Sequence, residues 1–482
     1  MKNYSVERLT KIAISLSSEK DIDNLLDAIL KEAMMITNCD GGTVYVYDDD
    51  EKLLRFHRLI TKSKGFSMGG HGEPVNLPPV KLNRSHICAC SAMDHKRIYI
   101  EDTYKSEVYD FSGAQKYDSL NDYRTVSMLV IPMEDEKGSV IGVLQLINAM
   151  DEDGNIIKFA DDLEEITAAL ASLAAVSLTN RKLARNVYDL LHSFVQVMVG
   201  AVDTRTPYNA AHTRHMVRYA ERFMDWLEET DNSRKFSENE RDPFIMSVWL
   251  HDIGKLVVPL KIMDKQTRLG ELYEKVRNRL EVGQLMERID RLEHPERKEA
   301  SLEREKALKQ AWETIKEAND AVIVREELQR KLEKISGMEC MTSDGSRVPV
   351  LTEKEYSAIT VKKGTLTEEE RIEMEKHVEY TSDFLSRMKF GGFYRNVPKW
   401  ASSHHEFLDG SGYPKHYSGD DLSKEVRIIT ILDIYDSLTA EDRPYKPPIP
   451  KERAFLILNE MAEQGKIDGE LLKLFEESGA WK

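Results

Sequence analysis

The chain is poor in the features that mark several common protein classes. Its 482 residues include only four cysteines, which argues against a disulfide framework. No apolar run approaches the roughly 20 residues that a membrane-spanning helix needs, and the first residues lack the pattern of a signal peptide. The net charge of −16 argues against duplex nucleic acid as a partner. We therefore expect a cytoplasmic protein with no membrane span and no bound nucleic-acid duplex.

The composition is that of a folded globular protein, with 41% apolar and 32% charged residues. The length exceeds what one ordinary core accommodates, so it predicts two or three domains. The acidic balance is compatible with a small anionic ligand, because the local field at a site outweighs the net charge. Cys88 and Cys90 form one Cys-x-Cys pair, which we interpret as two small buried or loop thiols in preference to a metal or redox site.

The N-terminal part predicts an α+β domain. Residues 1–38 have the spacing of two helices. Alternating apolar and polar residues predict strands at 41–49, at 53–60, at 95–102 and twice within 127–149. The last two strands are joined by a turn around Gly138. A meander of strands between helices is typical of an α+β fold.

A long helix is predicted to follow, because residues 159–199 contain neither glycine nor proline. Its second half carries apolar residues at alternating steps of four and three, the heptad spacing of a coiled coil: Leu183, Val187, Leu190, Phe194, Val197 and Ala201. This stripe predicts the seam of a parallel homodimer. The alternative is that it is buried in the core of the next domain.

The C-terminal part carries nine of the thirteen histidines. Several lie in doublets with another histidine or an aspartate, and the candidate ligands are His212, His251, Asp252, His377, His404, His405 and Asp433. Imidazole and carboxylate donors together suit manganese, iron or zinc. Neighbours on a helix point about 100° apart, so a doublet can serve two metal ions, and Asp252 can bridge them. We therefore predict a two-metal centre, which produces hydroxide near neutral pH and clamps the oxygens of a phosphoryl transfer.

Lys255 follows His251 by one helical turn and is expected on the same helix face. Its ammonium group can neutralise phosphate charge as that charge develops. We therefore name Lys255 and Asp252 as the candidate catalytic residues.

The N-terminal part resembles a GAF domain over roughly residues 5–180, and the passage YRTVSMLVIPMEDEKGSVIGVLQLINA carries most of the resemblance. Some GAF domains that bind cyclic nucleotides contain a motif written NKFDE. Asn148 and Phe159 fit this motif, whereas Ala149 replaces its lysine, and Leu163 and Glu164 stand where its acid pair would be. The resemblance thus implies a regulatory domain for which a cyclic nucleotide, another small ligand and no ligand all stay open.

The C-terminal part resembles the HD-GYP family of metal-dependent phosphohydrolases. HDIGK, HHEFLDGSGYP and the RPY of residues 443–445 carry the resemblance, which covers about 185–265 and 360–450. It implies a phosphodiesterase that opens cyclic di-GMP to linear pGpG and, in many members, cuts on to GMP. It also implies that the seven candidate ligands hold two divalent ions, iron or manganese in preference, with a third ion optional.

The family loop after the histidine doublet shapes the substrate mouth and is implicated in contacts with cyclase partners. Here this role falls on Asp409, Gly412, Tyr413 and, beyond the loop, Arg443. We expect the glycines to let backbone approach a bulky ligand closely, and the Tyr413 ring either to stack on a guanine or to pack within the turn.

Two departures from the family pattern stand out. Asp203 replaces the glutamate that is a ligand in three-metal members. Because its arm is one methylene shorter, we expect it beside a two-metal centre, where it accepts a hydrogen bond from a ligand histidine. The second departure is a charged insertion of about 95 residues, 266–361, which separates the two halves of a loop, so that either Lys265 or Lys362 supplies the loop lysine. Pro295 predicts two helices that form an antiparallel, solvated hairpin, a spacer or docking arm.

The sequence therefore predicts an α+β GAF domain at 1–158, a linker helix at 159–199, and an all-α HD-type domain at 185–482 that contains the helical-hairpin insertion at 266–361. Its predicted activity is hydrolysis of cyclic di-GMP under control of the GAF domain. Three alternatives stay open: hydrolysis of 3',3'-cyclic GMP-AMP, a non-catalytic receptor that recruits partners, and a general nucleotide phosphohydrolase. The GYP turn argues against the last of these.

Overall fold

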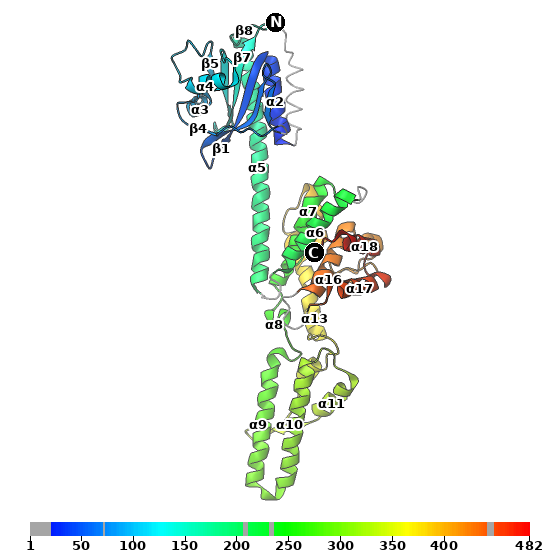
Figure 1. Cartoon of the computed structure of the whole chain (residues 1–482). Helices are drawn as coiled ribbons and strands as arrows, with labels where there is room; N and C mark the ends of the chain where they lie inside the picture. Colours follow the sequence, from blue (N-terminus) through cyan, green and yellow to red (C-terminus); the bar gives the residue numbers. More distant parts are fainter. Residues whose placement is uncertain (1–20, 71–72, 206–210, 231–235, 441–447) are drawn as a thin grey trace. The chain divides into compact units, whose positions relative to one another are not determined.

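The computed structural model describes residues 21–70, 73–205, 211–230, 236–440 and 448–482. The chain divides into two compact units, Met1–Leu190 and Leu191–Lys482, which are drawn in Figure 1. Among the described residues, no helix is both long and apolar enough to cross a membrane.

The first unit is built around one antiparallel sheet with strand order β3-β2-β1-β7-β6-β5, to which β4 adds on β2 and β8 on β7. The strands are β1 Cys39–Asp48, β2 Leu53–Thr61, β3 Phe66–Gly69, β4 Val80–Lys81, β5 Ile98–Ile100, β6 Met128–Glu134, β7 Val140–Met150 and β8 Ile156–Ile157. Its helices are α2 Ile22–Ile36, α3 Ile87–Asp94, α4 Ser112–Asn121 and the first part of α5 Asp161–Arg205. This arrangement confirms the predicted α+β fold.

Two cores cover the two faces of this sheet because side chains alternate along each strand. Leu144 and Leu146 of β7 pack with α2 and α5, whereas Val143 packs on the opposite face with α3. Cys88 and Cys90 belong to α3 and are both buried. Burial raises the pKa of the Cys88 thiol to about 12, so this thiol is protonated at neutral pH, as expected of a structural cysteine.

A cavity of about 450 Å³ opens between the sheet and α3 and α4 of the first unit. Its lining is mainly apolar and includes Tyr45, Ile60, Cys88 and Tyr117. The motif residue Asn148 has a structural role beside it, since its side chain donates to the Arg124 carbonyl and accepts from the Val126 amide.

The second unit is helical, as predicted. Its main helices are the end of α5, α6 His212–Thr230, α7 Glu238–Leu250, α8 Leu260–Met263, α13 Glu368–Glu375, α14 His377–Ser386, α15 Val397–Ala401, α16 Lys424–Thr439, α17 Lys451–Glu463 and α18 Gly469–Ser478. Three 3-10 turns join them: η1 Ile253–Leu256, η4 Gly392–Asn396 and η5 Gly419–Asp421. The largest core lies among α6, α7, α16, α17 and α18. In α6, Met216, Ala220 and Phe223 recur at steps of four and three and are fully buried, which is the periodicity of a helix with one apolar face.

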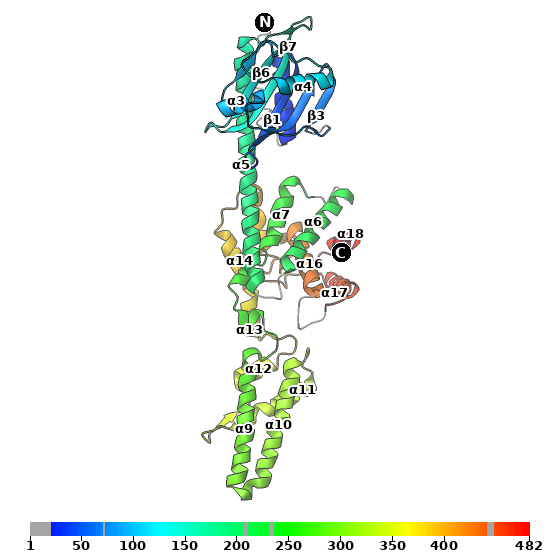
Figure 2. The same ribbon diagram turned by 60° about the vertical axis from the view of Figure 1, so that its left-hand side comes forward.

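The insertion contains the predicted antiparallel hairpin, in which α9 Tyr273–Glu293 and α10 Lys298–Asp320 lie side by side in both views (Figures 1 and 2). Pro295 begins the turn η3 Pro295–Arg297 between them. The expectation of a purely solvated pair is wrong, because the hairpin shares a core of its own with the smaller elements that surround it. These elements are η2 Gly270–Leu272, α11 Glu326–Ser336, β9 Glu339–Met341, β10 Arg347–Pro349 and α12 Glu353–Ile359. Leu280 of α9 and Leu308 and Ile315 of α10 belong to this core. These apolar residues were not recognised as a core in the sequence because charged residues dominate the segment.

The two ends of the insertion meet, although about 100 residues separate them. The Thr365 hydroxyl donates to the Lys265 carbonyl at 2.9 Å, and the Lys265 ammonium lies 2.6 Å from a Glu370 oxygen. The interrupted loop is therefore closed in space, as the sequence predicted.

Candidate metal centre

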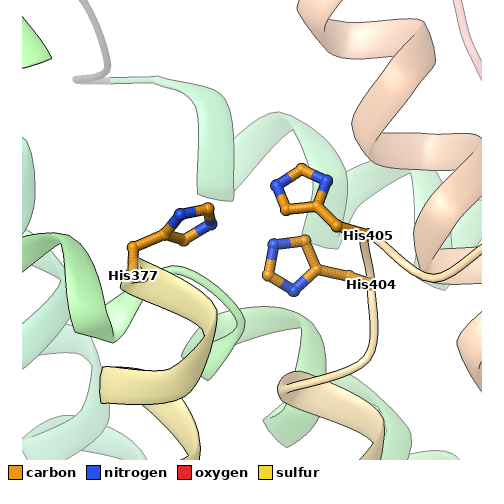
Figure 3. A group of neighbouring side chains, drawn as sticks. All are labelled: His377, His404 and His405. Carbon is orange, nitrogen blue, oxygen red and sulfur yellow. The ribbon is translucent and has the colours of Figure 1, made fainter. Parts of the chain in front are cut away.

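All seven candidate ligands come together, six from helix ends and turns and one from the middle of a helix. His212 begins α6, His251 and Asp252 follow α7, His377 begins α14, His404 and His405 lie just beyond α15, and Asp433 lies in the middle of α16. The His404–His405 doublet does not itself end a helix, because α15 stops at Ala401 and the doublet occupies the turn that follows. Figure 3 shows the rings of His377, His404 and His405 gathered around one space.

Backbone carbonyls orient three of the imidazole rings. The Nδ1 atoms of His251, His377 and His404 each lie 2.7 Å from the carbonyl oxygen three residues earlier. Because a carbonyl can only accept, each Nδ1 carries the proton and each Nε2 presents a lone pair. The Nε2 atoms of His377 and His404 are buried and have no hydrogen-bond partner among the described residues, which is the state a metal ion requires of an imidazole ligand.

Asp252 stands between two groups of histidines. Its Oδ2 lies 3.2 Å from the Nε2 of His251 and 3.7 Å from that of His212. Its Oδ1 lies 3.4 Å from the Nε2 of His377 and 3.9 Å from that of His404. Each oxygen of one buried carboxylate thus faces a different set of ring nitrogens.

Asp433 also contacts two rings, with Oδ1 3.2 Å from the His212 Nε2 and Oδ2 3.6 Å from the His405 Nδ1. Three sets of donor atoms lie close enough to share an ion: His377 with His404 and His405, His212 with His251 and Asp433, and His251 with Asp252 and His404. This donor set fits two neighbouring divalent ions that share Asp252.

The protonation states of His377 and Asp252 suit metal ligation. Burial lowers the pKa of His377 to about 3 and keeps the ring neutral. Burial opposes ionisation of Asp252, but the charge of Lys255 and the neighbouring His251 outweigh it and hold the carboxyl pKa well below its usual range. His212 differs, because the hydrogen bonds to Asp433 and Asp436 outweigh its burial and raise its pKa to about 9.

Lys255 contacts Asp252 directly, with the ammonium nitrogen 2.5 Å from Oδ2 and the side chain 15% exposed. We expected Lys255 on the α-helical face of His251, and this is wrong because α7 ends at Leu250 and Lys255 lies in η1. The chain turns tightly here, since Gly254 packs against α14. A Cβ added to Gly254 would lie 1.9 Å from the His377 carbonyl oxygen.

The sequence analysis missed Asp436, which holds His212 in place. Its Oδ2 lies 2.7 Å from the His212 Nδ1, so that the Nε2 of this ring turns toward Asp433 and Asp252. We expected Asp203 to make such a bond, but the structure gives it to Asp436. Asp203 is buried, and its nearest cation is the Arg214 guanidinium at 3.5 Å. The Asp433-x-x-Asp436 spacing was the available signal, because residues three apart share a helix face.

The loop after the doublet is held by a second residue that the sequence analysis missed. Glu406 is buried, and its two oxygens accept hydrogen bonds from the Lys415 amide at 2.7 Å and the Tyr417 amide at 3.1 Å. Gly412 is needed because a Cβ there would lie 2.5 Å from the His405 carbonyl oxygen. This glycine therefore lets the loop approach its own backbone, and its predicted approach to a ligand stays a prediction.

The other predicted substrate contacts are placed as follows. The Tyr413 ring lies on the His405 ring, with centroids 4.9 Å apart. Asp409 accepts from the amide and hydroxyl of Ser411 at the exposed loop tip. Lys265 is occupied by its ion pair with Glu370, and Lys362 is exposed within the segment that closes the loop. Arg443 lies outside the described residues.

Family models match two parts of the chain: a GAF domain at residues 19–179 and an HD domain at residues 354–471. The chain combines a GAF domain with an HD domain. The HD match contains His377, His404, His405 and Asp433, and the insertion separates this stretch from His212 and the His251–Asp252 doublet.

Curated relatives of this GAF–HD protein include a 3'3'-cGAMP-specific phosphodiesterase from Vibrio cholerae, 39% identical over 104 residues, which are 22% of either chain. Another is the cyclic di-GMP phosphodiesterase response regulator RpfG from Xanthomonas campestris, 33% identical over 110 residues, which are 23% of this chain and 28% of the relative. The matched part thus spans about a quarter of the length of these relatives. A solved GAF domain/HD domain protein from Geobacter sulfurreducens is 16% identical, and the match covers 36% of this chain and 99% of that one with a TM-score of 0.25.

Replacing Asp436 with alanine is expected to weaken metal binding by about 10- to 100-fold, because the outer hydrogen bond that orients His212 is lost. Competition with a chromogenic chelator measures this affinity. Asp383→Ala is the matched control, since Asp383 is half exposed and pairs only with the nearby Arg387 on the surface of α14. Equal metal affinities in the Asp436→Ala variant and the wild-type protein would contradict this role of Asp436.

Proposed function

We propose that this protein is a metal-dependent phosphodiesterase that hydrolyses cyclic di-GMP to linear pGpG, with GMP as the product of a second cut. The observation that carries the proposal is Asp252, a buried carboxylate whose two oxygens face two separate groups of ring nitrogens. A dinuclear donor set of this kind suits phosphoryl transfer. The relatives named above support a cyclic dinucleotide as the substrate class.

In this proposal, one ion is held by His212, His251, Asp433 and Asp252, and the other by His377, His404, His405 and Asp252. Iron or manganese fits this mixture of imidazole and carboxylate donors better than magnesium, which prefers oxygen ligands. When bound, the two ions supply a water of lowered pKa and neutralise charge on the attacking and leaving oxygens.

The side chains around the donor set have complementary tasks. Lys255 puts a positive charge beside Asp252, where it stabilises negative charge that develops on the phosphate. Tyr413 lies beside the His405 ring, and we assign to it the stacking of a guanine. Asp409 and Gly412 shape the same loop. We also assign substrate contacts to Arg443, to Lys362, and to Lys265, which would first have to leave its ion pair with Glu370.

A mixed 3',3'-cyclic GMP-AMP dinucleotide is the second candidate substrate, favoured by the printed activity of the Vibrio cholerae relative. A receptor without catalysis is the remaining alternative. The intact donor set and the contact between Lys255 and Asp252 argue against it, because dinucleotide binding alone requires neither.

The His251→Ala, Asp252→Ala double variant is expected to lose all hydrolysis, because it removes the shared carboxylate and one imidazole of the centre. Chromatography of products from metal-loaded protein incubated with cyclic di-GMP, cyclic di-AMP and 3',3'-cyclic GMP-AMP measures activity and substrate choice together. His294→Ala is the control, since His294 lies at the end of α9 in the insertion. Wild-type rates in the double variant would place the chemistry elsewhere.

Anaerobically purified protein is expected to contain two iron or manganese ions per chain, with Asp203 outside the coordination sphere. The short arm of Asp203 is the reason, since metal–ligand distances are held to within about 0.2 Å. Elemental analysis combined with anomalous scattering measures the count and the ligands, and Asp203→Ala is expected to retain both ions. Three fully occupied sites with an Asp203 oxygen at bonding distance would refute the two-metal assignment.

We further propose that α5 joins two chains in a parallel homodimer and carries signals from the GAF domain. Its heptad stripe is exposed: Leu183 56%, Val187 65%, Leu190 69%, Phe194 54% and Val197 71%. The opposite face of the same helix is buried at Val195, Val199 and Val202. These buried valines attach the helix to its own chain. The alternative, in which the stripe is buried in the core of the next domain, is therefore not needed to hold the helix in place.

Leu190→Cys is expected to form a disulfide between two chains, because equivalent core positions of a parallel coiled coil face one another. Non-reducing electrophoresis measures the cross-link, and the four native cysteines are all buried. Arg185→Cys is the control, since this exposed residue lies off the stripe. Equal cross-linking at both positions, or a monomer by light scattering, would argue against the seam.

Three further assignments complete the proposal. The cavity of about 450 Å³ in the GAF domain has the size of a small-ligand site, and its occupant would regulate hydrolysis. We assign domain limits of 1–158, 159–199 and 185–482, with 266–361 as a docking arm or spacer. We assign contacts with cyclase partners to the loop around Tyr413.

A further inference from the structure

Arg205, the last residue of α5, binds the backbone next to the catalytic lysine. Its guanidinium donates to the carbonyl of Lys255 at 2.8 Å, to that of Leu256, and to that of Val258 at 3.2 Å. These carbonyls lie at and just beyond the end of η1. The last carbonyls of a helical turn have no partner within it, so Arg205 supplies donors that the short turn lacks.

An arginine is required for this contact. The guanidinium carries five N–H donors in a rigid, planar fork, whereas a lysine ammonium is a single point on a flexible stem. Only the fork reaches three carbonyls spread over four residues at once. Lysine at this position keeps the charge and loses most of these bonds.

The same backbone segment is held on its other side by α14. The Thr381 hydroxyl donates to the His251 carbonyl at 3.0 Å and accepts from the Gly254 amide at 3.0 Å. Thr381 therefore fixes the start of η1 and Arg205 fixes its end, so that the turn bearing Lys255 lies between two anchors.

The helix that carries Arg205 is itself packed against the helix that leads to the centre. Val195 and Val199 of α5 share a buried cluster with Met246 and Leu250 of α7, and His251 follows Leu250 directly. The end of α5 therefore packs directly on the helix that leads to His251. Arg205 adds a second connection, from α5 to the backbone of Lys255.

We propose that Arg205 is a positioning residue through which α5 sets the place of the Lys255 ammonium beside Asp252. This inference rests on the proposed hydrolase function. Because α5 also runs through the GAF unit from Asp161, a shift of this helix reaches the centre through Arg205. Such a shift changes turnover through Lys255, whereas His251, His377 and His404 keep the carbonyl hydrogen bonds that orient their rings for metal ligation.

The test compares Arg205→Lys, Arg205→Ala and the wild-type full-length, metal-loaded protein. We expect kcat for cyclic di-GMP to fall by about 10- to 100-fold in both variants, with the metal content and the thermal midpoint unchanged. Hydrogen exchange of the amides in residues 253–258 should be faster, and added methylguanidinium should restore part of the turnover of Arg205→Ala.

Arg279→Ala is the matched control. Arg279 also donates to a backbone carbonyl, that of Val350 at 2.9 Å, and it pairs with Glu355 inside the insertion. We expect this variant to lose stability in the insertion and to keep its kcat. A similar loss of kcat in Arg279→Ala would mean that the Arg205 variants lose activity through general destabilisation of the protein. That result would overturn the proposal.

The remaining outcomes separate this inference from the proposed function. Wild-type kcat in Arg205→Lys, or a loss of activity that matches a loss of bound metal, overturns the positioning role. If the wild-type protein cleaves none of the cyclic dinucleotides, the hydrolase proposal fails. In that case, an unchanged rate of amide hydrogen exchange at residues 253–258 in Arg205→Ala would overturn the proposal that Arg205 holds this turn. Faster exchange would support it.

Discussion

The second unit depends on the burial of a carboxylate among imidazole rings. Asp252 is 4% exposed, and a buried charge is unfavourable unless opposite charges or hydrogen-bond donors surround it. Lys255 supplies one such group, and the rings of His251 and His377 approach the two oxygens. Because the rings must remain neutral to present lone pairs, the arrangement leaves a deficit of positive charge that divalent ions would fill.

The backbone around the centre holds the imidazole rings in orientations that direct their lone pairs inward. Three imidazoles bond to carbonyls of their own helical turns, so local geometry alone sets their orientation. His212 begins its helix, and its Nδ1 pairs with the Asp436 carboxylate. Thr430 adds a comparable restraint on the doublet, since its hydroxyl donates to the His404 carbonyl at 2.9 Å.

The insertion and the linker helix show how parts beyond the centre attach without disturbing it. The insertion has its own core and joins the HD domain where Thr365 meets Lys265. Helix α5 is apolar on two sides, one buried against α7 and one exposed in a heptad stripe. A helix of this kind can hold its place within one chain and still offer a surface to another.

Much of this protein could be predicted from sequence because the relevant signals are local. Alternation along residues 127–149 gave two adjacent strands, and the absence of glycine and proline in 159–199 gave one helix. The HDIGK and HHEFLDGSGYP segments contain four of the seven residues that converge, His251, Asp252, His404 and His405. Each of these signals lies within a few turns of helix or one strand. The prediction that Lys255 shares a helix face with His251 was wrong, because helix propensity alone could not show that Gly254 packs against α14.

Only the tertiary structure decided the contacts between residues far apart in the chain. Asp436 and His212 are separated by 224 positions, and Arg205 meets Lys255 across 50. Gly412 was recognisable as a turn residue, but the backbone that it packs against was not. Such partners are chosen by how buried polar groups satisfy one another once the helices have packed, and no local pattern records which distant donor and acceptor will meet.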